Sequence, residues 1–111
     1  MEIIKSSSDI TRVFKEGKRF GRGSNMVLVL ENEKQHGKPG RVAFVAGKKL
    51  GNAVWRNRAK RRMRAAYREA SVNLGGRDVV FVACRTTNDV DFDRMVDGYR
   101  KSLKQACVKA E

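Results

Sequence analysis

The sequence predicts an α+β fold, a two-layer sandwich in which three helices pack on a small mixed sheet of three to four strands. Segments with helical and with strand periodicity follow one another in the order α-β-β-α-β-α, and turn residues separate them. The length of 111 residues and the hydrophobic fraction of 41% allow one core. We therefore expect a single domain over residues 1–111.

The first helix is predicted between Ser6 and Gly17. Serine and aspartate side chains at its start can cap a helix, and Ile10, Val13 and Phe14 then follow at helical spacing. Because Gly17 interrupts this pattern, the helix should have roughly two to three turns.

Two strands are predicted next, at residues 26–30 and 41–47, because both segments are rich in β-prone apolar residues. The polar, turn-rich segment between them holds the only proline, Pro39. We expect these strands to form a long-looped antiparallel hairpin over residues 24–47. A short additional strand is expected near residues 19–22.

The second helix is predicted to begin after Asn52, a suitable N-cap, and to end at the glycines at 75 and 76. Its apolar positions recur at the i, i+3, i+4 period and should face the sheet: Ala59, Met63, Ala66, Tyr67 and Ala70. Residues 77–85 form the third predicted strand. If this strand pairs in parallel with residues 41–47, general handedness rules favour a right-handed crossover through the helix.

The last helix is predicted over residues 92–108, after a turn and cap at residues 86–93. Its apolar stripe consists of Phe92, Met95, Val96, Tyr99, Leu103, Ala106 and Cys107. Four aspartates in this region are interpreted as caps and as the solvated side of the helix, rather than as a two-metal site: Asp89, Asp91, Asp93 and Asp97.

Positive charge is concentrated in the middle of the chain. Of the net charge of +13, the window from Lys34 to Arg68 carries +12, with twelve basic residues and no acid. No carboxylate at i±3 or i±4 offsets the basic cluster of the second helix, because its first acid, Glu69, follows that cluster. Such a surface is typical of proteins that bind nucleic acid or anionic membranes.

Two alternatives to a nucleic-acid surface are less consistent with this helix. A solvated face that only maintains solubility does not need arginine in excess of lysine, whereas guanidinium groups bind phosphate bidentately. A membrane-surface helix needs bulky Leu, Phe and Trp, but this helix presents mainly Ala, Met and Tyr. Lys48 and Lys49 also precede the helix N-terminus, where the helix dipole favours phosphate. Nucleic acid is therefore the predicted partner.

The remaining reactive residues indicate neither a metal site nor a disulfide. Cys84 and Cys107 form no C-x-x-C pair and His36 is the only histidine, so we expect two buried thiols in a reducing cytosol. No apolar run reaches the ~18 residues of a membrane span, and the N-terminal residues lack the apolar core of a signal peptide. The expectation is a cytoplasmic protein with no membrane association, catalytic residue or cofactor of its own.

Residues 48–64, KKLGNAVWRNRAKRRMR, closely resemble the signature of the bacterial ribonuclease P protein subunit. The hallmark of that family is an Arg-Asn-Arg core, here residues 56–58, followed by further basic residues, here Lys60 and Arg61. The segments VFKEGKR, RVAFVAGKK and RDVVFVA occupy the family's positions and order, so the resemblance covers nearly the whole chain.

This resemblance implies an accessory subunit, one monomer per RNA, of a ribonucleoprotein endonuclease. Its RNA subunit would remove the 5′ leader of precursor tRNA, using Mg²⁺ held by the RNA. It also implies a left-handed crossover at the basic helix, against the general rule. The residues implied to contact the catalytic RNA are Lys48, Lys49, Asn52, Arg56, Asn57, Arg58, Lys60, Arg61, Arg64 and Arg68.

The resemblance further implies that the leader binds in a cleft between the first helix and the exposed sheet face. Phe14 matches the family's aromatic residue in the first helix, and Arg12, Lys15 and Phe44 are candidate neighbours, since aromatic faces stack bases and cations follow the backbone. For Phe14 and Phe44, ordinary core packing is the alternative.

Two other functions stay open. The charge by itself also fits a ribosome-associated structural RNA-binding protein, and a protein nuclease would use Asp91 or Asp93 to cleave RNA without an RNA subunit. The order of the motifs favours the ribonuclease P subunit, and we expect no nuclease activity from the free protein.

Overall fold

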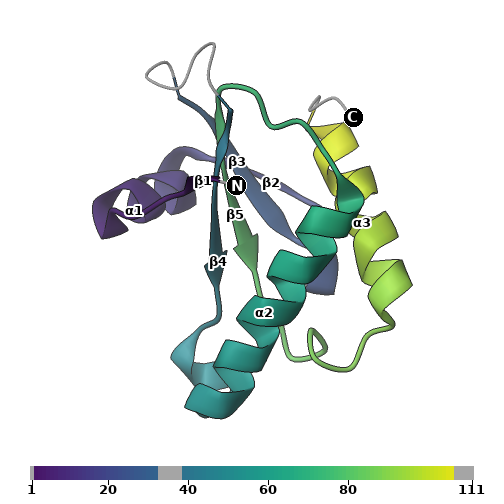
Figure 1. Cartoon of the computed structure of the whole chain (residues 1–111). Helices are drawn as coiled ribbons and strands as arrows, with labels where there is room; N and C mark the ends of the chain where they lie inside the picture. The colour runs from purple at the N-terminus through teal and green to yellow at the C-terminus, as the bar shows by residue number, and fades with distance from the viewer. Residues whose placement is uncertain (1, 33–38, 107–111) are drawn as a thin grey trace.

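The computed structural model describes residues 2–32 and 39–106 and shows within them three α-helices and a five-stranded sheet (Figure 1). In chain order the elements are β1 (Glu2–Ile3), α1 (Ser7–Glu16), β2 (Lys18–Phe20), β3 (Val27–Glu31), β4 (Arg41–Val45), α2 (Ala53–Ala70), β5 (Arg77–Val82) and α3 (Phe92–Gln105). The predicted α+β class is confirmed, with one strand more than the largest number expected. β2 is the short strand expected near residues 19–22, whereas β1 is too short for its periodicity to be recognised.

The sheet has the strand order β1-β4-β5-β3-β2, with β5 at its centre. β5 pairs in parallel with β4, Phe81 lying opposite Phe44, and pairs antiparallel with β3 on its other side. The predicted hairpin is therefore wrong, because β5 separates its two strands. Burial explains this placement: Val79, Val80 and Phe81 are fully buried, so β5 needs a strand on each side and cover on both faces.

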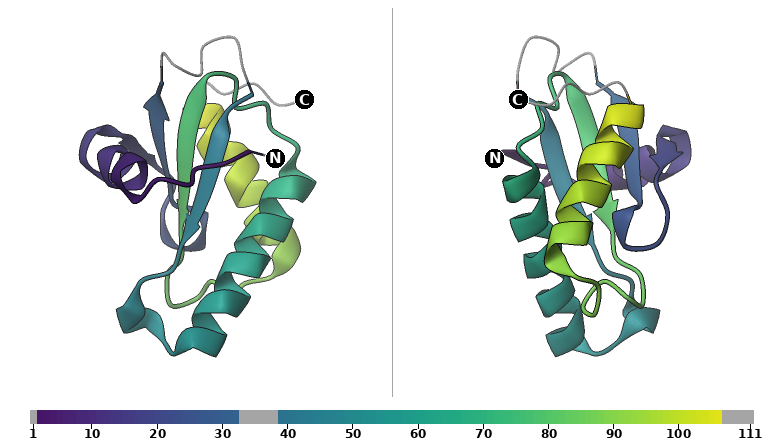
Figure 2. Two further views of the ribbon diagram at one scale, coloured as in Figure 1. Left: turned by 60° about the vertical axis from the view of Figure 1, so that its left-hand side comes forward. Right: turned by 90° about the vertical axis from the view of Figure 1, so that its right-hand side faces the viewer.

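The parallel strands β4 and β5 are connected through α2 on the face of the sheet that also carries α3 (Figure 2). Seen from that face with both strands running downward, β5 lies to the right of β4, so the crossover is left-handed (Figure 2, right). The general rule favoured the opposite hand. β1 occupies the edge of β4 on which a right-handed crossover would have placed β5.

Each face of the sheet has its own core. The face covered by α2 and α3 is built around residues such as Val42 and Phe81. On the opposite face α1 packs Val13 against Leu28 and Val80 (Figure 2, left). α1 therefore adds a partial third layer to the predicted sandwich.

The helices begin where the sequence predicts, since Ser6, Asn52 and Asp91 accept a backbone hydrogen bond at the N-termini of α1, α2 and α3. α2 ends at Ala70, before the predicted glycines, because Ser71 adopts the left-handed conformation with φ 50°. α3 is described to Gln105. The last two residues of the predicted helix, Cys107 among them, lie outside the described residues.

Candidate nucleic-acid interface

α2 separates an apolar side from a basic side. Ala59, Met63 and Ala66 are fully buried against the sheet and α3, as the helical period predicts. Asn57 and Arg58 of the Arg-Asn-Arg core are exposed, whereas Arg56 is half-buried. Within the part of the chain that the structure describes, Nε of Arg56 has no hydrogen-bond partner. The side chains of Asn57 and Arg58 are therefore open to the outside, whereas Nε of Arg56 is buried.

Most of the side chains implied to contact RNA lie at the surface. The exposed ones are Lys48, Lys49, Asn52, Asn57, Arg58, Arg61 and Arg68. The half-buried ones are Arg56, Lys60 and Arg64. Among residues 2–32 and 39–106, none of these lysines and arginines forms an ion pair; the ion pairs there belong to Arg12, Arg41, Arg77 and Arg100. A basic face without internal counter-charges leaves its field available to an external anion.

Three arginines of α2, Arg58, Arg61 and Arg62, line an open hollow of about 470 Å³. Arg61 and Arg62 follow Arg58 by three and four residues, so the three side chains project from neighbouring parts of the helix surface. Each guanidinium carries donors in a fork that matches phosphate oxygens. The hollow is therefore chemically suited to a phosphate group.

Contacts within the protein orient two of the arginines. Nη1 of Arg62 donates a hydrogen bond of 2.6 Å to the carbonyl of Thr87, which ties α2 to the turn after β5. The guanidinium carbon of Arg64 lies 5.7 Å from the centroid of the Phe44 ring, within the range of a cation–π contact. Arg62 thus has a structural role in addition to its position at the hollow, and the Phe44 ring favours the observed orientation of Arg64.

The N-terminus of α2 combines a cap with two lysines. Oδ1 of Asn52 accepts from the backbone N of Trp55 at 2.9 Å, so this oxygen serves the helix rather than RNA. Lys48 and Lys49 are exposed in the 3₁₀ turn Lys48–Leu50 just before the helix. Gly51 is extended, and its role is close packing rather than a turn, because a Cβ there would lie 3.0 Å from Trp55 side-chain atoms.

On the opposite side of the sheet, α1 exposes 46% of Phe14. Lys15 and Arg12 are also exposed, and Nε of Arg12 pairs with Oε2 of Glu16 at 3.0 Å. At about 100° per residue, Arg12 and Phe14 point about 200° apart around the helix. The structure therefore places the two residues on different flanks of α1 and does not bring them together.

The sheet face beside α1 is aliphatic. Leu30, Val45 and Val82 are only half-buried there and pack against the small core under α1. These half-buried side chains leave part of an apolar surface open on the face of the sheet that carries α1.

The assignment of Phe44 to the cleft beside α1 is wrong. Side chains of a strand alternate between its two faces, and Phe44 shares the α2 side with Phe81, at a ring-centroid distance of 5.0 Å. It also packs 6.3 Å from the ring of Tyr67. Phe44 therefore has the core-packing role that was the alternative to leader binding. Phe14 does not have a core-packing role, because its side chain is exposed.

A buried ion pair that the sequence did not predict joins α1 to the sheet. Nε and Nη2 of Arg41 donate to the carboxylate of Asp78 at 2.9 and 2.7 Å, and Nη2 also contacts Oδ2 of Asp9 in α1 at 3.4 Å. Asn32 donates to Asp78 at 2.9 Å. The hydrogen bond to Asp78 raises the pKa of Arg41 above its ordinary value, although burial opposes this shift. The only sequence signal was an acid inside the apolar strand RDVVFV.

Two further side chains, also not predicted, hold the ends of α2. Nδ2 of Asn88 donates to the carbonyl of Trp55 at 3.1 Å. The guanidinium of Arg100 donates to the carbonyls of Glu69 and Ala70 at 3.0 and 3.2 Å, where a cation also suits the helix dipole. These contacts connect α2 to α3 and to the turn that precedes α3.

Asp91, the N-cap of α3, and Asp97 within it are engaged in helix capping and pairing. Oδ2 of Asp91 accepts from the backbone N of Arg94 at 3.2 Å, and Asp97 pairs with Arg100 at 3.3 Å. Among the described residues, no group of three or more His, Cys, Asp or Glu side chains is placed to hold a metal ion. In the same part of the chain, no helix combines the length and apolarity needed to cross a membrane.

Comparisons with known proteins agree on one family. The family model described as Ribonuclease P matches residues 1–107. The ribonuclease P protein component of Streptococcus mutans is 34% identical over 108 residues, which cover 97% of this chain and 88% of that protein. The corresponding protein of Halalkalibacterium halodurans is 35% identical over 109 residues, covering 97% and 87%.

Solved structures show the same fold. The RNase P protein of Staphylococcus aureus superposes with a TM-score of 0.76 at 26% identity, covering 98% of both chains. The RNase P protein of Thermotoga maritima gives a TM-score of 0.69 at 26% identity, covering 96% of this chain and 94% of that one.

Proposed function

The chain belongs to the ribonuclease P protein family, and from this premise we propose that it binds the catalytic RNA of ribonuclease P through α2 and the turn before it. Membership implies an RNA partner, a role in tRNA processing and participation in an endoribonuclease complex. The observation that carries the proposal is the basic side of α2, whose lysines and arginines have no ion-pair partners among the described residues. Crowded RNA phosphates would supply the missing counter-charge and release counterions.

We assign the catalytic-RNA contacts to the exposed and half-buried basic side chains of this surface. The hollow between Arg58, Arg61 and Arg62 is the proposed position of one phosphate, and Lys48 and Lys49 are proposed to bind phosphates beside the N-terminus of α2. The contact of Arg64 with Phe44 supports this role, because a side chain already held in place loses less entropy on binding.

The 5′ leader of precursor tRNA is proposed to bind on the other side of the sheet, along α1. Phe14 is the aromatic residue available there for base stacking. Half-buried aliphatic side chains of the neighbouring sheet face can contact sugars and bases, and Lys15 can follow the backbone. Phe44 has no part in this surface. The two proposed RNA surfaces therefore lie on opposite faces of one sheet.

We propose that the RNA subunit is the catalyst and holds the Mg²⁺ ions. The carboxylates of Asp91 and Asp97 already cap α3 and pair with Arg100, so they do not fit a two-metal site on the protein. The contribution of the protein is binding energy, which positions the leader and favours the folded RNA. We also propose that the protein is cytoplasmic and that one copy binds each RNA subunit.

Reconstitution tests this function. The protein is added to a bacterial catalytic RNA and precursor tRNA at low Mg²⁺, and cleavage of the leader should be faster than with RNA alone. The protein without RNA subunit serves as control and should not cleave. No gain over RNA alone would contradict the proposal. Co-purification with ribosomal RNA but not with the catalytic RNA would favour a structural ribosomal role instead.

A further inference from the structure

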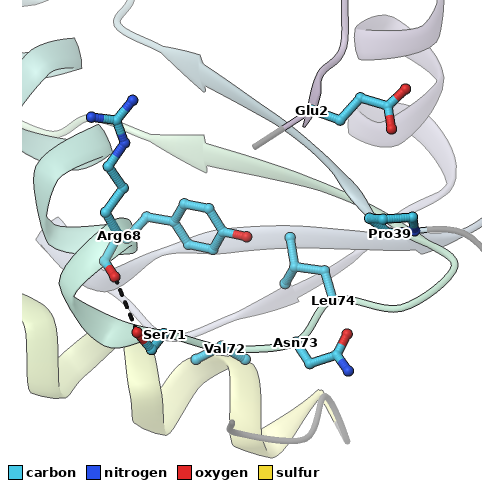
Figure 3. A pocket seen from close by; sticks show the side chains of 9 residues that line it. Glu2, Pro39, Arg68, Ser71, Val72, Asn73 and Leu74 are labelled. Carbon is cyan, nitrogen blue, oxygen red and sulfur yellow. Dashed lines mark hydrogen bonds between the residues drawn. The ribbon is translucent and has the colours of Figure 1, made fainter.

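A pocket of about 570 Å³ lies at the C-terminal end of α2, away from the arginine hollow (Figure 3). Its lining comes from the last turn of α2, the segment 71–74, the residues before β4, and β1. The volume is within the range of about 300–1,000 Å³ that is usual for small-ligand sites. The pocket is therefore large enough for a single nucleobase.

The walls of this pocket are apolar in one part and polar in another. Val72 and Leu74 are almost fully buried and supply aliphatic surface, and the half-buried ring of Tyr67 lies beside them. Arg68 and Glu2 lie on opposite sides of the pocket (Figure 3). A nucleobase has the same division, with apolar ring faces and hydrogen-bonding edges, and it is joined to an anionic phosphate.

Close packing and a sharp turn shape this pocket. Gly40 allows the chain before β4 to pack closely on the segment 71–74, because a Cβ there would lie 2.5 Å from Cβ of Leu74. Ser71 has a positive φ of 50°, which turns the chain sharply at the end of α2. Oδ1 of Asn73 accepts from the backbone N of Gly75 at 3.0 Å and stabilises the following turn.

The basic side of α2 leads directly to this pocket. Lys60, Arg64 and Arg68 are spaced by four residues and therefore lie along one side of the helix. An RNA strand that followed this row would reach Arg68, which lines the pocket. The site is continuous with the proposed RNA surface, but nothing in the Arg-Asn-Arg motif contributes to it.

We propose that this pocket binds one unstacked nucleobase of the catalytic RNA, with an adjoining phosphate on Arg68. The proposal rests on the proposed function, since it assigns a nucleotide of the same RNA to a second position on the protein. Tyr67, Val72 and Leu74 contact the base, while Asn73 and Glu2 supply a donor and an acceptor for its edge.

The first experiment uses the free protein, labelled with ¹⁵N and ¹³C, in an NMR titration. AMP, GMP, CMP and UMP are added separately, and inorganic phosphate is the control. The nucleotides should shift the side-chain amide of Asn73 and the methyl groups of Leu74 in a saturable way, whereas phosphate should shift only Arg68. Unchanged Asn73 and Leu74 signals with all four nucleotides would overturn the proposal. Equal shifts of these signals with inorganic phosphate would mean that the pocket is an anion site, which would also overturn the nucleobase proposal.

The second experiment measures affinity for the catalytic RNA with a matched pair of variants. Asn73→Asp keeps Oδ1 as the acceptor for Gly75 but places a negative charge in the pocket. Gln105→Glu makes the same change of charge on α3, outside the pocket lining. Asn73→Asp should weaken binding about fivefold, the factor that corresponds to about 1 kcal/mol of charge repulsion. Gln105→Glu should weaken it less than about twofold, because solvent screens a charge on this exposed side chain outside the pocket lining.

The outcomes separate the pocket from the function on which it rests. Equal losses in the two variants would overturn the nucleobase proposal while leaving the wild-type protein an RNA-binding subunit. A wild-type protein that does not bind the catalytic RNA would overturn the proposed function and the pocket together. Urea denaturation of both variants, with midpoints equal to that of the wild type, ensures that folding does not account for the difference.

Discussion

Arg61 and Arg62 are adjacent in α2, and we expect their replacement by alanine to have different consequences. Arg62 donates a hydrogen bond of 2.6 Å to the carbonyl of the fully buried Thr87, whereas Arg61 is exposed. Loss of a charged hydrogen-bond donor from a buried carbonyl costs about 1.5–3 kcal/mol, while truncation of an exposed side chain costs about 0.5 kcal/mol or less. Arg62→Ala should therefore lower the free energy of unfolding by about 1.5–3 kcal/mol, and Arg61→Ala should leave it nearly unchanged.

Urea denaturation followed by circular dichroism at one salt concentration measures these stabilities. Affinity for the catalytic RNA is then measured against salt, where the loss of one phosphate contact reduces the slope of log K on log[salt] by about 0.7–0.9. Arg61→Ala should show this reduction at wild-type stability. Equal destabilisation by the two substitutions would refute the internal role of Arg62, and an unchanged slope for Arg61→Ala would refute its contact with phosphate.

Four further substitutions test other parts of the structure. Asp78→Ala removes the buried partner of Arg41, which keeps only its contact with Asp9, and should destabilise the protein by about 3 kcal/mol, measured by urea denaturation; a loss below about 1 kcal/mol would contradict the role of this ion pair. Phe14→Ala should weaken binding of leader-bearing tRNA relative to mature tRNA without lowering the free energy of unfolding. Phe44→Ala should instead lower the free energy of unfolding by about 3 kcal/mol. The same loss of stability in both variants would contradict the placement of the two residues on opposite faces of the sheet. Burial raises the pKa of Tyr99, so the neutral side chain's contribution to folding stability is full below the ordinary tyrosine pKa and is lost as pH rises above it. Tyr99→Phe, which cannot ionise, should therefore lose less stability in alkali than the wild type. A steeper alkaline loss of stability in the variant would argue against this.

Much of the fold follows from local patterns. The caps at Ser6, Asn52 and Asp91 and the apolar sides of the helices are visible in the sequence because they depend on residues within one or two helical turns. The pairing of strands is not local in this way. The central position of β5 depends on pairing with residues 37 positions away in β4 and 46 to 54 positions away in β3. Its burial on both faces depends in turn on where the helices pack.

The same distinction applies to the candidate site. The basic side of α2 was predicted correctly from period and charge, and its contact with RNA stays a prediction. The role of Phe44 was not predictable, because an alternating strand with two apolar faces does not show which face a given residue takes. Arg41 and Asp78 are likewise 37 residues apart, so only the parallel pairing of β4 and β5 reveals that they meet.

The sequence by itself determined that this protein has a helix with one apolar side and one basic side that lacks counter-charges, because helical spacing and charge are properties of neighbouring residues. Only the tertiary structure decided which charges of that helix remain available. Arg62 is bound to Thr87, Arg64 is held on Phe44, and Arg68 borders a pocket built with β1 and the residues before β4. The physical reason is that a side chain's hydrogen bonds and solvent exposure depend on atoms that folding brings close from distant parts of the chain.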